Sequence, residues 1–436
     1  MTRITAIDGS RISNFLWFQR DPLSFLLHAS KLGDMVSIEA SKKYPTYVVS
    51  APDLIKEILV TKDKYFEKGR AASILSRTVG NGLLTSEGET HRRQQKMIRP
   101  AFYKEHLLHY ANKIVQKANA TDFQVEKEFN MSQRMMELTL EIITVTMFGK
   151  EVGEKKAEIA ESVDTIIYQA AKTLFSPLPI PFKFPTPGNR KHHQSNEKIN
   201  EFIYQLISDQ KKTGATKDTL LHMLLATTYE NGESLPEEEI RDQLVTMLLA
   251  GHETTATALT WAWYLLAKHP EIEEKFHEEL TNKLGGRQPT FEDVRDLPYT
   301  ETIFQETIRL YPPAWIILRE SLSEVEVGGD TYPRKTTFMI SPFAIHRKPP
   351  YFDEAEKFLP ERFMDHPSPP TFSYFPFSGG PRACIGSNFA MMEAILILAT
   401  IGQKYRFRLV EPQDIELVPL VSLRVKGGLN MVANSR

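Results

Sequence analysis

One predicted helix constrains the fold of this chain more than any other stretch. Ser234-Leu235-Pro236-Glu237 has the form of a capping box, in which a hydroxyl residue precedes a glutamate by three positions. Helix-favouring residues then continue to Lys268-His269-Pro270, where basic residues and a proline end the pattern. Such a helix is longer than the usual globular helix, and much of its middle is apolar. We therefore expect it to cross the centre of a large core.

The remaining pattern predicts a mainly α protein with a smaller β region. The chain has 436 residues, of which 41% are hydrophobic, and no Gly/Ser linker or repeat divides it. Residues 104–170 have a helical pattern, and Met35–Ile38 and Tyr47–Val49 predict paired strands around a turn at 41–43. Ser50-Ala51-Pro52-Asp53 indicates a helix start. We expect one domain over residues 1–436, with no fused reductase.

Two further segments are expected to be irregular. Residues 66–84 contain Gly69, Gly80 and Gly82, and residues 176–188 contain five prolines, which exclude a helix. The composition of residues 66–84 also fits an ordinary surface loop. Residues 176–188 could be a domain linker, although their apolar residues favour a packed loop.

Charge and cysteine content limit the class of protein. There are 53 basic and 55 acidic residues, so the net charge of -2 gives no sign of nucleic-acid binding. One cysteine excludes an intramolecular disulfide and fits a reducing compartment. The N-terminus has no long apolar run, so we expect no signal peptide, no membrane anchor and a cytoplasmic location.

The only cysteine lies in a glycine-rich loop, Phe377-Ser378-Gly379-Gly380-Pro381-Arg382-Ala383-Cys384-Ile385-Gly386, directly before a predicted helix. The positive end of that helix favours a thiolate, and glycines permit the close approach of a flat group. A thiolate in this setting suits an axial ligand of haem iron. There are two other interpretations. The cysteine could be a buried, inert thiol. It could also be a nucleophile resembling the caspase Q-A-C-x-G site, although the glutamine of that string is absent here.

The middle of the long helix carries Ala250-Gly251-His252-Glu253-Thr254-Thr255. A hydroxyl at Thr254 and a carboxyl at Glu253 could deliver protons to a reacting oxygen. Gly251 could allow close approach of a cofactor and a local bulge. The alternative is a buried helix whose polar groups are simply hydrogen-bonded.

These strings resemble the signatures of the cytochrome P450 family. F-x-x-G-x-R-x-C-x-G is matched from Phe377 to Gly386, and [AG]-G-x-[DE]-T-[TS] from Ala250. Glu306 and Arg309 match the family's E-x-x-R, which Arg362 would complete as a structural triad. The resemblance covers nearly all of the chain and implies the cytochrome P450 fold, with the long central helix over haem b and Cys384 as iron ligand.

The resemblance also implies which residues hold the haem propionates. His91 occupies the position of a family Trp or His, and Arg319 and Arg382 supply guanidinium groups that match a carboxylate. Gln95 departs from the family, which has a cation there; it can donate a hydrogen bond but brings no charge. Ala250, Gly251, Phe377 and Gly386 would approach the haem itself.

By the same resemblance, residues 66–84 cover the substrate pocket and residues 176–188 join two lid helices. The apolar residues expected to line the pocket are Leu249, Ala314, Trp315, Ile316, Ile317 and Leu423. Fatty acids, terpenoids, steroids and polyketides would all suit such a lining.

The activity implied is insertion of one atom of O2 into a hydrophobic small molecule. Electrons would come from a separate donor, such as a ferredoxin or flavodoxin with its reductase. A peroxide-driven peroxygenase is one alternative, although that class lacks the acid–alcohol pair. A non-catalytic haem sensor or carrier, which would not need Glu253 and Thr254, is a second. A cysteine hydrolase, which would need a histidine near Cys384, is a third.

Overall fold

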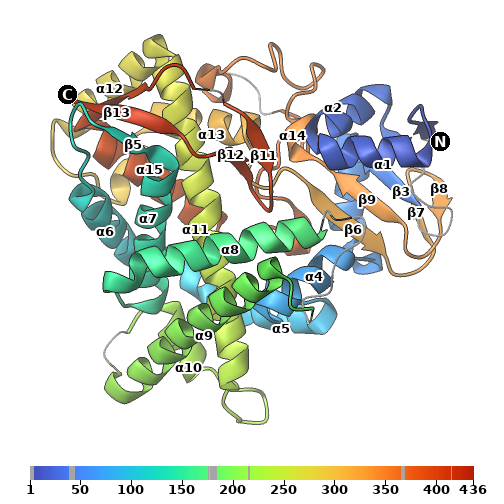
Figure 1. The fold of residues 1–436 in the computed structure, drawn as a ribbon, viewed down its shortest axis with the longest axis horizontal. Coiled ribbons are helices and arrows are strands. Elements are labelled where there is room, and N and C mark those ends of the chain that lie inside the picture. The colour runs from blue at the N-terminus through green and yellow to red at the C-terminus, as the bar shows by residue number, and fades with distance from the viewer. Residues whose placement is uncertain are drawn as a thin grey trace.

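The computed structural model describes residues 4–38, 45–174, 176, 184–214, 217–364, 369–413 and 415–436. Its helices are α1 (Arg11–Arg20), α2 (Pro22–Leu32), α3 (Pro52–Lys56), α4 (Arg70–Val79), α5 (Gly88–Ile98), α6 (Lys104–Ala120), α7 (Met131–Ile143), α8 (Lys156–Leu174), α9 (Pro187–Thr213), α10 (Leu220–Ala226), α11 (Glu237–Lys268), α12 (Pro270–Leu284), α13 (Pro298–Leu310), α14 (Pro342–Ile345) and α15 (Ser387–Gly402). Figure 1 shows the helices as the bulk of the molecule, with a smaller β region at one side. The predicted fold class is confirmed.

The expected long helix is α11, and it crosses the centre of the molecule (Figure 1). It packs against α7, α9, α13 and α15. Its start differs from the prediction, because Pro236 occupies the N-cap position and no side chain caps the helix. Ser234 instead pairs with Thr228 in an isolated β-bridge. Three consecutive glutamates in the first turn complement the positive helix end in place of the capping box.

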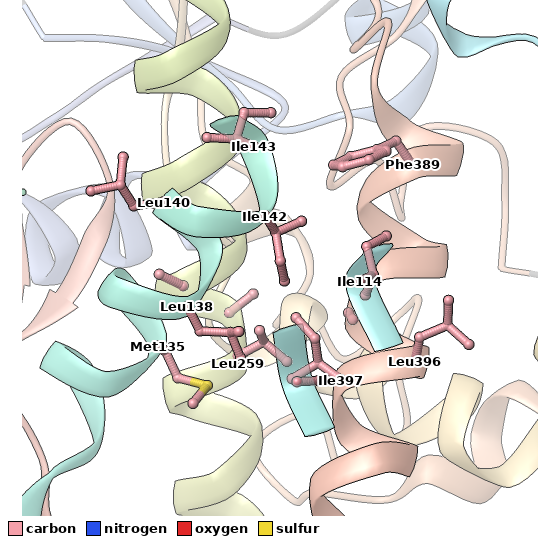
Figure 2. Close-up of a cluster of buried hydrophobic side chains, with 14 of the residues drawn as sticks. Ile114, Met135, Leu138, Leu140, Ile142, Ile143, Leu259, Phe389, Leu396 and Ile397 are labelled. Atoms are coloured by element: carbon pink, nitrogen blue, oxygen red, sulfur yellow. The ribbon is translucent and has the colours of Figure 1, made fainter. Parts of the chain in front are cut away.

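Apolar faces of α6, α7, α11 and α15 form the central part of the core (Figure 2). Ile142 and Ile143 of α7 lie between the central helix and α15, which follows the cysteine loop. The residues labelled there are Ile114, Met135, Leu138, Leu140, Ile142, Ile143, Leu259, Phe389, Leu396 and Ile397. This packing fixes the position of the cysteine loop relative to the middle of α11.

In the described part of the chain, the strands form one larger sheet and three smaller ones. The larger sheet has the order β1-β2-β3-β9-β6-β4, with β1 (Ile4–Ala6), β2 (Met35–Ser37), β3 (Thr46–Val49), β4 (Phe66–Glu67), β6 (Ile317–Ser321) and β9 (Thr337–Ile340). The predicted pairing of β2 with β3 is confirmed, with Val36 opposite Val48 in an antiparallel register. The turn predicted at 41–43 lies outside the described residues.

The smaller sheets are β10-β13-β5, β7-β8 and the hairpin β11-β12. Their bounds are β5 (Glu128–Asn130), β7 (Val325–Val327), β8 (Asp330–Tyr332), β10 (Tyr405–Leu409), β11 (Leu417–Pro419), β12 (Leu423–Val425) and β13 (Asn430–Ser435). In the hairpin, Val418 lies opposite Arg424. This hairpin reaches the central helix, where Oγ of Ser422 lies 3.4 Å from Oγ1 of Thr257.

Residues 66–84 are not irregular throughout, which corrects the prediction. They contain β4 and the helix α4, and Gly69 and Gly80 occupy the N-cap and C-cap positions of that helix. Both glycines have positive φ angles, +62° and +80°, so they mark the two ends of the helix rather than prevent it. Most of the proline-rich stretch 176–188 lies outside the described residues.

No helix within the described ranges combines the length and the apolar character needed to cross a membrane.

Candidate active site

The cysteine loop is held by close backbone contacts. The N–H of Cys384 donates to the carbonyl of Phe377 at 2.9 Å. Gly380 has φ +71°, and a Cβ there would lie 2.0 Å from the carbonyl oxygen of Leu59. Only glycine allows both this backbone conformation and this approach. The loop therefore presents the sulfur from a backbone fixed by both its own turn and a neighbouring segment.

The thiol of Cys384 is accessible although protein atoms surround much of it. Burial by these atoms raises the pKa of the thiol. The backbone N–H of Gly386 opposes this rise through a hydrogen bond. Desolvation outweighs this hydrogen bond, so the pKa of the free thiol lies above its usual value. An accessible sulfur within the fold is what a ligand to a buried iron requires.

Four basic side chains converge beside this loop. Arg319 is only 5% exposed, and among the described residues its Nε has no hydrogen-bond partner. Burial and the charge of Arg382 lower the pKa of Arg319 to about 10. Burial, followed by the charges of Lys68, Arg382 and Arg319, lowers the pKa of His91 to about 4. The positive charges of Arg319, Arg382 and Lys68, together with the buried N–H of Arg319 that lacks a partner among the described residues, form a site for an anion.

Lys68 belongs to this group and was missed by the sequence analysis. Its Nζ donates to the carbonyls of Leu83, Leu84 and Ser86, and burial lowers the pKa of its amine to about 8. It lies between β4 and α4, in the stretch taken as an irregular loop. The sequence gives no periodic signal that would have placed this lysine near Arg319.

Arg382 and Gln95 are engaged by protein groups. Arg382 forms ion pairs with Glu87 and with Asp63, the latter at 3.3 Å. The side-chain amide of Gln95 donates to the carbonyl of Pro381 at 2.8 Å. These bonds tie the cysteine loop to the segments before α4 and α5. Gln95 therefore holds the loop through one N–H of its amide, and the propionate contact expected for it stays a prediction.

The motif in α11 differs from expectation at Gly251. The helix runs without a break through this position and forms no bulge. A Cβ on Gly251 would lie 2.7 Å from Cδ1 of Ile143, so a larger residue would require the Ile143 side chain of α7 to shift. The hydroxyl of Thr254 is exposed and donates to the carbonyl of Ala250 at 2.7 Å. Thr254 thus presents its oxygen to open space next to the helix.

Glu253 is directed into the protein and is 2% exposed. Its Oε1 accepts hydrogen bonds from Ser422 at 2.6 Å and from Nε of Arg424 at 2.8 Å. Burial raises the pKa of the Glu253 carboxyl, and the charge and hydrogen bonds of these two partners oppose that rise. The raised pKa makes this carboxyl easier to protonate than an exposed one, which suits a group that takes up and gives up protons.

The residues predicted to line the substrate pocket fall into two groups. Ala314 is exposed and Ile316 and Ile317 are partly buried, whereas Leu249 is 8% exposed. Trp315 and Leu423 are 1% and 0% exposed and lie in a core cluster with Phe25 and Phe343. We withdraw these two from the pocket, because they offer no surface to a ligand.

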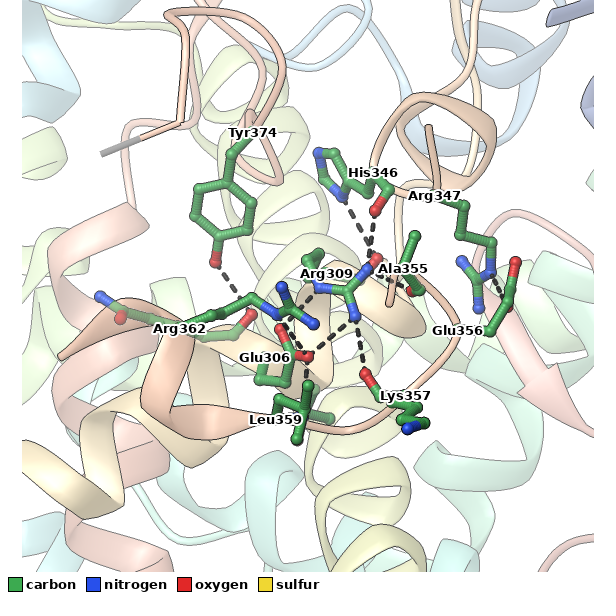
Figure 3. A network of polar contacts seen from close by, with 12 residues as sticks. Glu306, Arg309, His346, Arg347, Ala355, Glu356, Lys357, Leu359, Arg362 and Tyr374 are labelled. Atoms are coloured by element: carbon green, nitrogen blue, oxygen red, sulfur yellow. Dashed lines mark hydrogen bonds and ion pairs between the residues drawn. The ribbon is translucent and has the colours of Figure 1, made fainter. Parts of the chain in front are cut away.

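Glu306, Arg309 and Arg362 meet as an ion-pair network (Figure 3). The carboxylate of Glu306 lies 2.6 Å from Nε of Arg309 and 2.9 Å from Nε of Arg362. Arg309 also donates to the carbonyls of His346, Ala355 and Lys357. The network joins α13 to the segment that leads to the cysteine loop.

Comparisons with known proteins agree with this geometry. A family model described as Cytochrome P450 matches residues 10–428. The chain is 34% identical to "Cyclooctatin synthase" of Streptomyces melanosporofaciens over 97% of this chain and 93% of that protein. It is 34% identical to "Cyclooctat-9-en-7-ol 5-monooxygenase" of the same organism over 90% and 86%. It is 33% identical to "Pentalenene oxygenase" of Streptomyces avermitilis over 93% and 91%.

Proposed function

This chain belongs to the cytochrome P450 family, and from that premise we propose that it is a monooxygenase of terpenoid hydrocarbons or alcohols. As a P450 it is a haem-containing oxidoreductase of the monooxygenase class. The terpenoid class is our proposal. It is supported by the names of the similar Streptomyces proteins, two of which are called a monooxygenase or oxygenase of an unsaturated ring compound.

The residues of this chain fit a haem. Cys384, whose sulfur is accessible, would ligate the iron. Arg319, whose Nε has no hydrogen-bond partner in the described part of the chain, would meet a propionate together with Lys68 and His91. When bound, haem supplies the iron at which O2 is activated. We propose that it is haem b and that Glu253 and Thr254 hold and move the protons that the reaction consumes. Electrons would come from a separate ferredoxin or flavodoxin with its reductase.

The observation that carries this function is the accessible Cys384 thiol in a loop beside Arg319, a buried arginine whose Nε has no hydrogen-bond partner among the described residues. The first test is the absorbance of the purified, reduced protein under carbon monoxide, for wild type and Cys384→Ser. A strongly red-shifted Soret band that disappears in the variant is expected. A band indifferent to the substitution, or no haem at all, would overturn the assignment.

The second test concerns the substrate. Cyclic terpene hydrocarbons, pentalenene among them, would be titrated against the oxidised protein, with lauric acid as a fatty-acid comparison. The expected result is a spin-state shift with the terpenes at lower concentration than with lauric acid, followed by hydroxylated product with a ferredoxin system. The reverse order would reject the terpenoid class. Product with hydrogen peroxide but none with the ferredoxin system would identify a peroxygenase.

A further inference from the structure

Glu253 is bound by a hairpin more than 160 residues away in the sequence. Ser422 lies at the turn of the β11-β12 hairpin and Arg424 lies in β12; both donate to the same carboxylate oxygen, at 2.6 and 2.8 Å. Because Glu253 is only 2% exposed, water does not reach it directly. Any proton that this carboxyl gives up must be replaced through neighbouring polar groups.

A cleft of about 580 Å³ lies on the far side of these contacts. It is bounded by α7, α8, α11 and the hairpin, which lie together in Figure 1. Asp164, Thr257 and Arg424 all line it. Two short polar connections therefore run from the cleft to Glu253, one through hydroxyl groups and one through charged groups.

The hydroxyl connection can carry a proton. Oγ1 of Thr257 lies 3.4 Å from Oγ of Ser422, which in turn donates to Glu253. Serine and threonine hydroxyls both donate and accept, so each can take a proton on one side and pass one on the other. The O···O distance between Thr257 and Ser422 is longer than in a usual hydrogen bond between hydroxyl groups. This contact is therefore the weaker one of the connection, and it is the one next to the cleft.

The charged connection has a different role. Arg424 pairs with Glu253 at 2.8 Å and with the half-exposed Asp164 at 3.0 Å. An arginine cannot be deprotonated in a protein, so it does not relay protons. It stabilises the negative charge that remains on Glu253 after a proton has left. Asp164 of α8 and Arg424 of β12 are the charged groups that act on Glu253.

We propose that this cleft is the solvent side of the proton supply to Glu253, and that Ser422 and Arg424 are the positioning residues that connect the two. The proposal rests on the proposed function. Insertion of one oxygen atom into a C–H bond, with the other leaving as water, consumes O2, two electrons from the reductase system and two protons. The protons pass from cleft water through Thr257 and Ser422 to Glu253, and Arg424 holds the carboxylate between transfers.

The test compares two ways of driving the same enzyme. With O2 and a ferredoxin system, protons must come from the protein. With hydrogen peroxide, the oxidant brings its own protons and electrons. The variants are Ser422→Ala and Arg424→Gln, and the substrate is the terpene that binds most tightly in the screen above. Lys426→Gln is the matched control, because Lys426 lines the same cleft but pairs with Glu416 at 2.6 Å.

We expect Ser422→Ala and Arg424→Gln to keep a normal carbon monoxide spectrum and to retain peroxide-driven product within about twofold of wild type. Product per NAD(P)H with O2 should fall by about tenfold or more, because a positioned proton donor contributes about 10²–10⁴-fold. Released peroxide should rise correspondingly. Lys426→Gln should change neither mode, and Arg424→Lys, which keeps the cation, should restore part of the loss.

Equal losses in both modes would show that the hairpin contacts are only structural and would overturn the proposal. Unchanged product per NAD(P)H in Ser422→Ala and Arg424→Gln would overturn it as well. No product from the wild-type protein in either mode would overturn the proposed function together with this inference, so the two failures are distinguishable.

Discussion

Replacing Glu306 by Gln should remove the acceptor on which two arginines depend. The carboxylate accepts from Nε and one terminal nitrogen of Arg309 at 2.6 and 2.8 Å, from Arg362 at 2.9 Å and from the N–H of Leu359 at 3.0 Å. A glutamine presents an NH2 group in place of one of the two oxygens, so at least one arginine N–H would then face another donor. The site would also keep its positive charges and lose the negative one.

Arg309 cannot find other acceptors. Its side chain is 0% exposed, and its remaining N–H groups already donate to the carbonyls of His346 and Ala355 at 2.7 Å and of Lys357 at 3.1 Å (Figure 3). Loss of one or two charge-assisted bonds costs about 1.5–3 kcal/mol each. Leaving a buried charge unpaired costs about 3–5 kcal/mol. We therefore expect Glu306→Gln to lower the free energy of unfolding by about 3–5 kcal/mol.

The measurement is the midpoint of urea denaturation, compared at equal slope between variants. Glu301→Gln is the control, because Glu301 lies on the same helix and its side chain accepts one hydrogen bond, from Gln305 at 3.2 Å. It should shift the midpoint little. A solvent-exposed ion pair contributes at most about 1 kcal/mol to the free energy of unfolding. A loss for Glu306→Gln below that value, and equal to the loss for the control, would therefore refute the reasoning.

Two further predictions test the cysteine loop and a buried acid. Gly380→Ala should reduce the haem bound per protein, because its Cβ would lie 2.0 Å from the Leu59 carbonyl oxygen. The control is Gly427→Ala, at a similar φ of +70° with no atom within 4 Å, which should leave haem binding unchanged. Equal effects of the two substitutions would contradict the packing argument. Burial raises the pKa of Glu393 from 4.5 to about 8, so between those pH values the folded protein keeps a proton that the unfolded chain has lost, and stability falls as pH rises. Glu393→Gln should therefore change the free energy of unfolding little at pH 5 and raise it at pH 8, by roughly 1.4 kcal/mol for each pH unit crossed. An identical shift of the urea midpoint at both pH values would show that the carboxyl is not protonated in the folded protein.

Local patterns in the sequence were sufficient for much of the fold. The helix that became α11 and the strands β2 and β3 were predicted, because periodicity and turn residues act over a few positions. The errors also have local causes. Gly69 and Gly80 were taken as breakers of structure, although at positive φ they cap a ten-residue helix between them. Composition alone does not distinguish a loop from a short helix with a glycine at each end.

The sequence was sufficient to predict the residue types of the site, but not the directions in which their side chains point. The string around Glu253 and Thr254 identifies an acid and an alcohol on one helix, yet adjacent residues on a helix point about 100° apart. Thr254 accordingly faces open space while Glu253 faces the hairpin. Ser422 and Arg424 donate the hydrogen bonds that hold the Glu253 carboxylate. No spacing rule in the sequence connects these two residues to α11. A motif therefore identifies the group that reacts, whereas the source of its protons depends on tertiary contacts, and this is why comparing O2-driven with peroxide-driven turnover tests something that the motif cannot.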